Sequence, residues 1–133
     1  MLLIILILLV SQYFTLKEFA SPDNAPMPPL AQKNITEIVI PGLTFIRKNT
    51  GIPMIITSGY RSPEHNAKVG GVKNSEHTLG LAADVAVKNA IMRYKFIKYA
   101  LAYPITRIGV YNTFLHFGFS TEHPQNVIWT SIE

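Results

Sequence analysis

The chain has 133 residues, which is enough for one domain with a hydrophobic core of its own. It contains no cysteine, so disulfides and thiolate metal ligands are excluded, and any zinc site must use histidine and carboxylate. The net charge is +4 and the basic residues are scattered, without a run or an aromatic-interleaved patch, so we do not expect a nucleic acid partner.

The first ten residues, 1–10, are apolar without a break. A bilayer span needs about 20 residues, so this segment is too short to cross a membrane. Its length matches the core of a signal peptide, although no basic segment precedes it and no clear cleavage site follows. We expect residues 1–12 to be an export or anchoring segment in contact with a membrane, and residues 13–133 to be the domain. An extension that packs on the domain and a misassigned start codon are the alternatives.

Helical patterns dominate the first part of the domain. A capping box at Thr15–Glu18 predicts a short helix that ends near Ala20, and a loop with four prolines follows over 21–29. The apolar spacing over 30–49 predicts a helix, which the Pro41–Gly42 pair should kink or split.

Shorter elements are expected in the middle of the chain. Residues 54–57 are predicted to form a strand, and Ser62 followed by a proline predicts the start of another helix. The glycines within 69–72 predict a flexible loop. After that loop, residues 82–87 have the apolar composition of a buried strand.

The last part of the chain predicts one more helix and most of the sheet. Strands over 107–111 and 114–119, separated by a tight turn, predict a hairpin, and a last strand is expected over 127–130. Helices that precede most of the strands favour an α+β domain, with the helices packed on a small antiparallel sheet. A helix is expected over 89–103, with four apolar side chains facing the core: Ile91, Phe96, Ile97 and Leu101.

Asp84 lies in the middle of the apolar strand over 82–87. Burying an isolated ionised carboxylate is too costly unless a cation or hydrogen-bond donors compensate its charge. The chain has only one other aspartate, Asp23, and that residue lies in the proline-rich loop. Asp84 therefore needs a partner, and a metal ion shared with His77 and His116 is the most economical one.

The spacing between His77 and Asp84 requires a bend in the chain. Seven residues span roughly 10 Å along a helix, and more than roughly 20 Å along a strand, where the two side chains would also face opposite ways. Neither arrangement closes a site whose metal–ligand bonds are about 2 Å long. Gly80 can supply the bend, so a loop should deliver His77 and a strand Asp84.

His116 is predicted to face the same site from the hairpin. Alternation over 114–120 puts Leu115 and Phe117 on one face of the strand and His116 on the other, beside Gly118. Two histidines and one carboxylate with an open fourth position are typical of catalytic zinc. For either histidine alone, a hydrogen-bonded core residue is the alternative, and Asp84 alone could cap a turn. The three together favour zinc.

The pattern Ser75-x-His77-x-x-Gly80-x-Ala82-x-Asp84, with a later aromatic-x-His116, resembles a known family. It is similar to the zinc D-Ala-D-Ala carboxypeptidases and L-alanyl-D-glutamate endopeptidases, which cut bacterial cell-wall peptides. The segments 55–62 and 13–19 are also similar to the family, the latter to its short phage-type members. The resemblance covers most of residues 13–120 and implies the fold shared with hedgehog and the DD-peptidases.

The resemblance also implies a function and a site. It implies Zn²⁺ held by His77, Asp84 and His116, with Arg61 binding the substrate. The substrates would be peptidoglycan stem peptides, and the protein a monomeric metallopeptidase that is exported, membrane-anchored, or phage-encoded and acting on a host cell wall. Two alternatives stay open at this stage. Arg61 could instead form a surface salt bridge with Glu64 or Glu76, and Ser75 could either bind substrate or cap the loop.

The general base is not assigned. Usual family members carry an acidic residue three positions before the last histidine, where this chain has Thr113, and some short members carry an aspartate two positions after it, where this chain has Gly118. A peptidase normally needs a carboxylate that takes and returns a proton. A non-catalytic zinc-bearing binding or structural module of the same fold is therefore the alternative function. The remaining acidic candidates match no family position: Glu64, Glu76 and Glu122. His123, in the tail, is expected to be solvated.

Overall fold

The computed structural model describes residues 13–131. The apolar segment over 1–10, predicted to serve export or anchoring, lies outside the described residues. Within the described part, no helix has both the length and the apolar character that a membrane crossing requires. The helical elements are η1 (Leu16–Phe19), α2 (Pro29–Asn34), η2 (Ile35–Val39), α3 (Ile40–Thr50), α4 (Pro63–Lys68), η3 (Glu76–Leu79) and α5 (Ala90–Ala102), and the strands are β1 (Ile56–Ser58), β2 (Ala82–Ala86), β3 (Arg107–Tyr111), β4 (Phe114–Gly118) and β5 (Val127–Ser131).

The five strands form one sheet in the order β1-β2-β4-β3-β5. The predicted α+β class and the predicted hairpin of β3 and β4 are confirmed. One detail of the prediction is wrong, because β5 pairs with β3 in parallel and the sheet is therefore mixed. After β4 the chain crosses to the far edge of β3 over residues 119–126 and reverses, so β5 runs opposite to β4 and in the same direction as β3.

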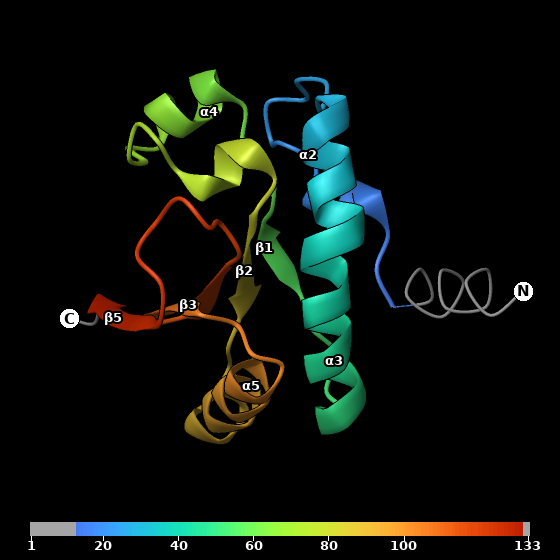
Figure 1. Ribbon diagram of the computed structural model, residues 1–133, viewed down its shortest axis with the longest axis vertical. Coiled ribbons are helices and arrows are strands. Elements are labelled where there is room, and N and C mark those ends of the chain that lie inside the picture. Colours follow the sequence, from blue (N-terminus) through green and yellow to red (C-terminus); the bar gives the residue numbers. More distant parts are fainter. Residues whose placement is uncertain (1–12, 132–133) are drawn as a thin grey trace, which may run out of the picture.

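The long helical segment over 29–50 is not split at Pro41. It forms one continuous column, drawn in cyan and teal in Figure 1, in which a π-helical turn, η2, links α2 to α3. Proline cannot donate a backbone hydrogen bond and crowds the carbonyl four residues earlier. The π turn lies directly before Pro41, where it replaces the regular i→i−4 hydrogen bonding that a proline interrupts. The column therefore continues to Thr50. Gly51, with φ of 68°, then ends it in the left-handed conformation.

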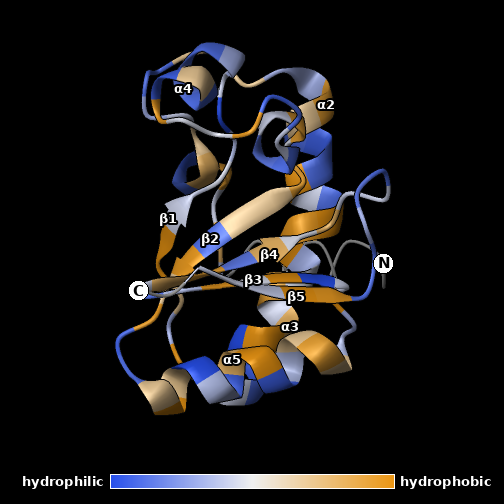
Figure 2. Cartoon of the chain, turned by 90° about the vertical axis from the view of Figure 1, so that its left-hand side faces the viewer, coloured by the Kyte–Doolittle hydropathy of each residue, from blue (hydrophilic) through white to orange (hydrophobic). Residues whose placement is uncertain are grey.

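The sheet separates an apolar layer from a polar one. In Figure 2, α5 lies below the sheet and α4 above it, whereas the α2–α3 column runs behind the strands. The inward face of α5 carries Phe96 and Ala100, which are fully buried, whereas Ile91 and Leu101 are 68% and 49% exposed. The prediction that Ile91 and Leu101 face the core is therefore wrong. Both lie more than a quarter turn away from the stripe through Phe96 and Ala100 that packs inward.

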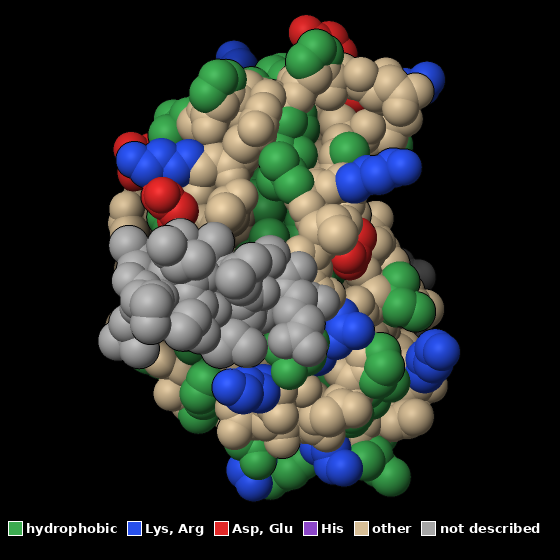
Figure 3. Space-filling view, turned by 90° about the vertical axis from the view of Figure 1, so that its right-hand side faces the viewer, with side chains coloured by type: hydrophobic (Ala, Val, Ile, Leu, Met, Phe, Trp, Pro, Cys, Tyr) green, Lys and Arg blue, Asp and Glu red, His purple; other side chains and the backbone are tan. Residues whose placement is uncertain are grey.

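The basic side chains do not gather on the face shown in Figure 3. Lys and Arg side chains there lie apart from one another, some of them beside acidic side chains. On that face the distribution matches the scatter of basic residues along the sequence.

Candidate metal centre

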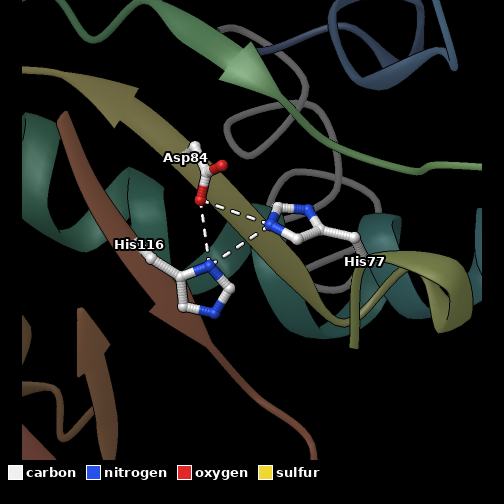
Figure 4. A group of neighbouring side chains, drawn as sticks. All are labelled: His77, Asp84 and His116. Carbon is white, nitrogen blue, oxygen red and sulfur yellow. Dashed lines mark hydrogen bonds and ion pairs between the residues drawn. The ribbon is translucent and has the colours of Figure 1, made fainter. Parts of the chain in front are cut away.

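Three side chains converge on the polar face of the sheet. Asp84 of β2 and His116 of β4 are direct cross-strand partners, and His77 reaches them from η3. His116 Nδ1 lies 2.9 Å from Asp84 Oδ1 and 3.2 Å from His77 Nε2. His77 Nε2 lies 3.3 Å from Asp84 Oδ1. Figure 4 shows the three side chains pointing toward one another from three separate segments.

The bend that delivers His77 is where the sequence predicts it. Gly80 follows η3 with φ of 69°, and a Cβ there would lie 2.6 Å from the backbone oxygen of Ala31. Only glycine fits this position, on both conformational and steric grounds. Ser75 caps the start of η3, with its hydroxyl oxygen accepting from the backbone N–H of His77. Ser75 is therefore a cap of η3; it also lines the cavity beside the cluster, and its binding of substrate stays a prediction.

Hydrogen bonds outside the cluster orient both histidine rings. His77 Nδ1 donates to the carbonyl of Gly59 at 2.7 Å, which leaves Nε2 directed at Asp84. His116 Nε2 donates to the Glu76 carboxylate at 2.7 Å, which leaves Nδ1 directed at the same point. Metal-binding histidines commonly donate their second ring N–H to a carbonyl or a carboxylate in this way.

The charges in the cluster compensate one another. Burial raises the pKa of Asp84, but hydrogen bonds from His116 and His77 outweigh that effect and hold the pKa below its usual range. Burial likewise lowers the pKa of His116, but its bonds to Asp84 and Glu76 raise it more. Both the buried Asp84 and the buried Glu76 therefore favour a positive charge at this place, whether on an imidazole or on a metal ion.

The donor set fits zinc. Two imidazole nitrogens and one carboxylate oxygen lie within 4.8 Å of one another, and all three residues are buried. Nitrogen and oxygen ligands of this kind are the ones that catalytic zinc uses in a chain without cysteine. The cluster also lines a cavity of about 470 Å³. A fourth ligand position can therefore face that cavity.

Arg61 borders the same cavity but is already hydrogen-bonded. Its guanidinium lies 3.4 Å from Asp84 Oδ2, 3.1 Å from Ser58 Oγ and 3.3 Å from Asn66 Oδ1. Its side chain is 18% exposed. The alternative salt bridges with Glu64 and Glu76 do not form, and Asp84 is the carboxylate that Arg61 contacts.

Two charged residues of the site were not predicted from the sequence. The sequence suggested Glu76 only as an acidic candidate without a family position and as an alternative partner of Arg61, yet it is buried and bonded to His116. Arg107, on β3, is buried beside Glu76 at 3.1 Å. Arg107 is the first residue of an otherwise apolar strand, and this position was the signal in the sequence that could have indicated the pair.

The prediction that His123 is solvated is also wrong, because it is half-buried and bonded to Ser120 Oγ and the carbonyl of Asn74.

Among the described residues, the cavity lining holds two carboxylates, Asp84 and Glu76, so the other acidic candidates do not lie beside the cluster. Thr113 is exposed in the turn between β3 and β4 and does not line the cavity. Glu122 is exposed in the tail and also lies outside the lining. The carboxylate of Glu76 is held on the Nε2 side of His116, away from the nitrogen that faces Asp84 and His77.

The comparisons with known proteins agree with the site. The family model for Peptidase M15 matches residues 12–118, which include all three residues of the cluster. The chain therefore belongs to the M15 peptidases, the family of the zinc D-Ala-D-Ala carboxypeptidases. The predicted family and fold are confirmed, and the family is one of zinc-dependent metallopeptidases that act on peptidoglycan peptides. The phage-type subgroup stays a prediction. No curated protein matches the chain significantly.

Proposed function

We propose that residues 13–133 form a zinc peptidase domain that hydrolyses peptide bonds in bacterial cell-wall peptides, with His77, Asp84 and His116 as the zinc ligands. The observation that supports it most is the convergence of these three donors in an open cavity of a chain from the M15 family. Bound there, zinc would polarise the scissile carbonyl and lower the pKa of the attacking water.

Other residues of the cavity would bind the peptide. Arg61 lies beside the ligand Asp84, so its partly exposed guanidinium can pair with a substrate carboxylate next to the reacting bond. Aromatic side chains also line the cavity: Tyr111, Phe114 and Trp129. Tyr111 and Phe114 stack with ring centroids 4.4 Å apart, which gives an apolar wall for the aliphatic part of a stem peptide.

A second candidate function is a zinc-bearing binding module that does not turn over its ligand. The observation in its favour is the exposed Thr113 at the position of the family's usual acidic residue. Without that carboxylate, proton transfer to the leaving amine lacks an assigned donor, and such help is typically worth about a hundred- to ten-thousand-fold in rate.

One experiment separates the two functions. Purified protein is incubated with muropeptides and with intact peptidoglycan, with and without a chelator, and the products are identified by mass spectrometry. Cleavage that stops with the chelator and in His116→Ala supports the peptidase. Binding of muropeptides without any cleavage supports the binding module, and neither binding nor cleavage contradicts both.

Arg61→Ala tests the substrate contact within this function. We expect it to keep its zinc and to lose about 1.5–3 kcal/mol of peptide binding, the value of one charge-assisted hydrogen-bond pair. The matched control is Lys48→Ala, which removes the same charge at an exposed position of α3. Unchanged peptide affinity and turnover in Arg61→Ala would remove Arg61 from the substrate site.

A further inference from the structure

We propose that Glu76 is a positioning residue for His116, and that the absence of a side chain at Gly118 makes this possible. Glu76 would hold the ring so that Nδ1 faces Asp84 and His77 while Nε2 keeps its proton. The inference rests on the zinc site of the proposed function and adds to it the group that sets the orientation of one ligand.

The Glu76 carboxylate is fixed by donors on both of its oxygens. Oε2 accepts from His116 Nε2 at 2.7 Å, and Oε1 accepts from the backbone N–H of Ser120 at 3.1 Å. Arg107 Nε lies 3.1 Å from each oxygen. The side chain of Glu76 is only 4% exposed, so these partners replace water. Every partner is a donor, so both oxygens act as acceptors, as they do in an ionised carboxylate.

Arg107 is itself held in place. Its Nη1 donates to the carbonyl of Pro124 at 2.6 Å, and its guanidinium lies 5.2 Å from the ring of Trp129. A cation in this position is attracted to the indole face. The orientation of His116 therefore depends on a connection that runs from the half-buried Trp129 through the buried Arg107 to the buried Glu76.

Gly118 provides the space for this carboxylate. It lies on β4, two residues after His116 and on the same face, and a Cβ built there would meet Glu76 Oε2 at 2.2 Å. The carboxylate of Glu76 thus fills the volume that a side chain at position 118 would occupy. A carboxylate delivered from position 118 would reach the same volume, provided that Glu76 were removed.

The test exchanges the two positions and measures zinc affinity by competition with a chromophoric chelator. Loss of such an outer carboxylate typically costs about 10–100-fold in metal affinity, so we expect that loss in Glu76→Ala. Gly118→Asp alone should also bind zinc weakly, because two carboxylates then compete for one place. The double variant Glu76→Ala/Gly118→Asp should recover most of the wild-type affinity. Glu64→Ala, at an exposed glutamate of α4, is the matched control.

A spectroscopic readout separates positioning from general stability. Long-range ¹H–¹⁵N spectra of the zinc-loaded protein report which imidazole nitrogen carries the proton. We expect His116 to be protonated at Nε2 in the wild type and in the double variant, and to lose that single form in Glu76→Ala. If Glu76→Ala fails to fold, Glu76→Gln serves instead. An amide has one oxygen and one N–H₂ group, so the N–H₂ group must face a donor, either His116 Nε2 or the Ser120 N–H. One of the two hydrogen bonds is then lost.

The outcomes distinguish this inference from the proposed function. Wild-type zinc affinity and the wild-type His116 tautomer in Glu76→Ala, or in Glu76→Gln where the alanine variant does not fold, would overturn the positioning role alone. A double variant no better than Glu76→Ala would overturn the role of Gly118. A wild-type protein that binds no zinc would overturn both the inference and the proposed function.

Discussion

The two faces of strands β2 and β4 are both buried, but they are stabilised in different ways. On one face, Val85 pairs with Leu115 and Ala83 with Phe117, and none of these side chains is exposed. On the other face, Asp84 pairs with His116, and both are charged or polar. The first face gains free energy from apolar burial alone, whereas the second keeps its charges only because each has a partner. Changes on the first face should therefore alter stability alone, and changes to the charged groups of the second should alter metal binding as well.

The largest loss of stability is expected for Phe117→Ala. Phe117 is fully buried on the apolar face, so its removal should cost about 3–5 kcal/mol of unfolding free energy. Phe114→Ala is the matched control, because the same residue type lies on the same strand but faces the cavity and is only half-buried. Denaturant unfolding measures both. Equal losses in the two variants would contradict the difference between the faces.

The next largest effect is expected for Arg107→Ala on the polar face. Glu76 would lose its arginine but keep its bonds to His116 and Ser120. We therefore expect the unfolding free energy to fall by about 1.5–3 kcal/mol. Zinc affinity should fall as well, which no change on the apolar face should cause. Lys95→Ala, at an exposed position of α5, is the control for charge. A variant as stable as the wild type would show that Glu76 does not need Arg107.

A smaller effect is expected for Gly109→Ala. Gly109 lies between His116 and Trp129 in the sheet, and a Cβ there would come within 2.7 Å of the indole. Because Trp129 is on an edge strand and only half-buried, its indole can shift. We therefore expect the unfolding free energy to fall by only about 1 kcal/mol. Trp129 is the only tryptophan, so its fluorescence reports the shift directly. An unchanged spectrum would mean that the indole does not pack on this strand.

The smallest effect is expected for Asp23→Asn, at an exposed carboxylate that belongs to neither face. Hydrogen bonds from Ser62 and Ser21 lower the pKa of Asp23 to about 2. A lowered pKa stabilises the fold above the ordinary value near 3.8, and this contribution is lost as the pH falls through about 2. The difference in Tm between wild type and Asp23→Asn should therefore shrink between pH 4 and pH 2. A constant difference would contradict the bond to Ser62.

Much of the fold could be predicted from local patterns. The hairpin, the bend at Gly80 and the two faces around His116 follow from alternation and from what glycine alone can do. The parallel pairing of β5 could not be predicted, because it depends on where a connection of irregular structure returns to the sheet. The helical column continues through Pro41 because of a π turn, and no local sequence pattern predicted that turn.

The convergence of the three donor residues could be predicted because a buried carboxylate requires a compensating partner. Asp84 needed compensation in a strand, and that need identified the two histidines that the structure places beside it. Glu76 could not be found in the same way, because a short helical turn aims it at His116, whereas an extended loop would have directed it elsewhere. Its partner Arg107 comes from a strand whose register with β4 is a property of the whole sheet.

Zinc content is the most direct test of the central claim that His77, Asp84 and His116 form the metal centre. The protein is purified, dialysed mildly and analysed for zinc by elemental analysis, together with His116→Ala, Asp84→Ala and the control His65→Ala, whose histidine lies on α4 outside the cluster. We predict one zinc per chain in the wild type and in His65→Ala, and loss of zinc in the other two. Unchanged zinc stoichiometry in His116→Ala would contradict the account.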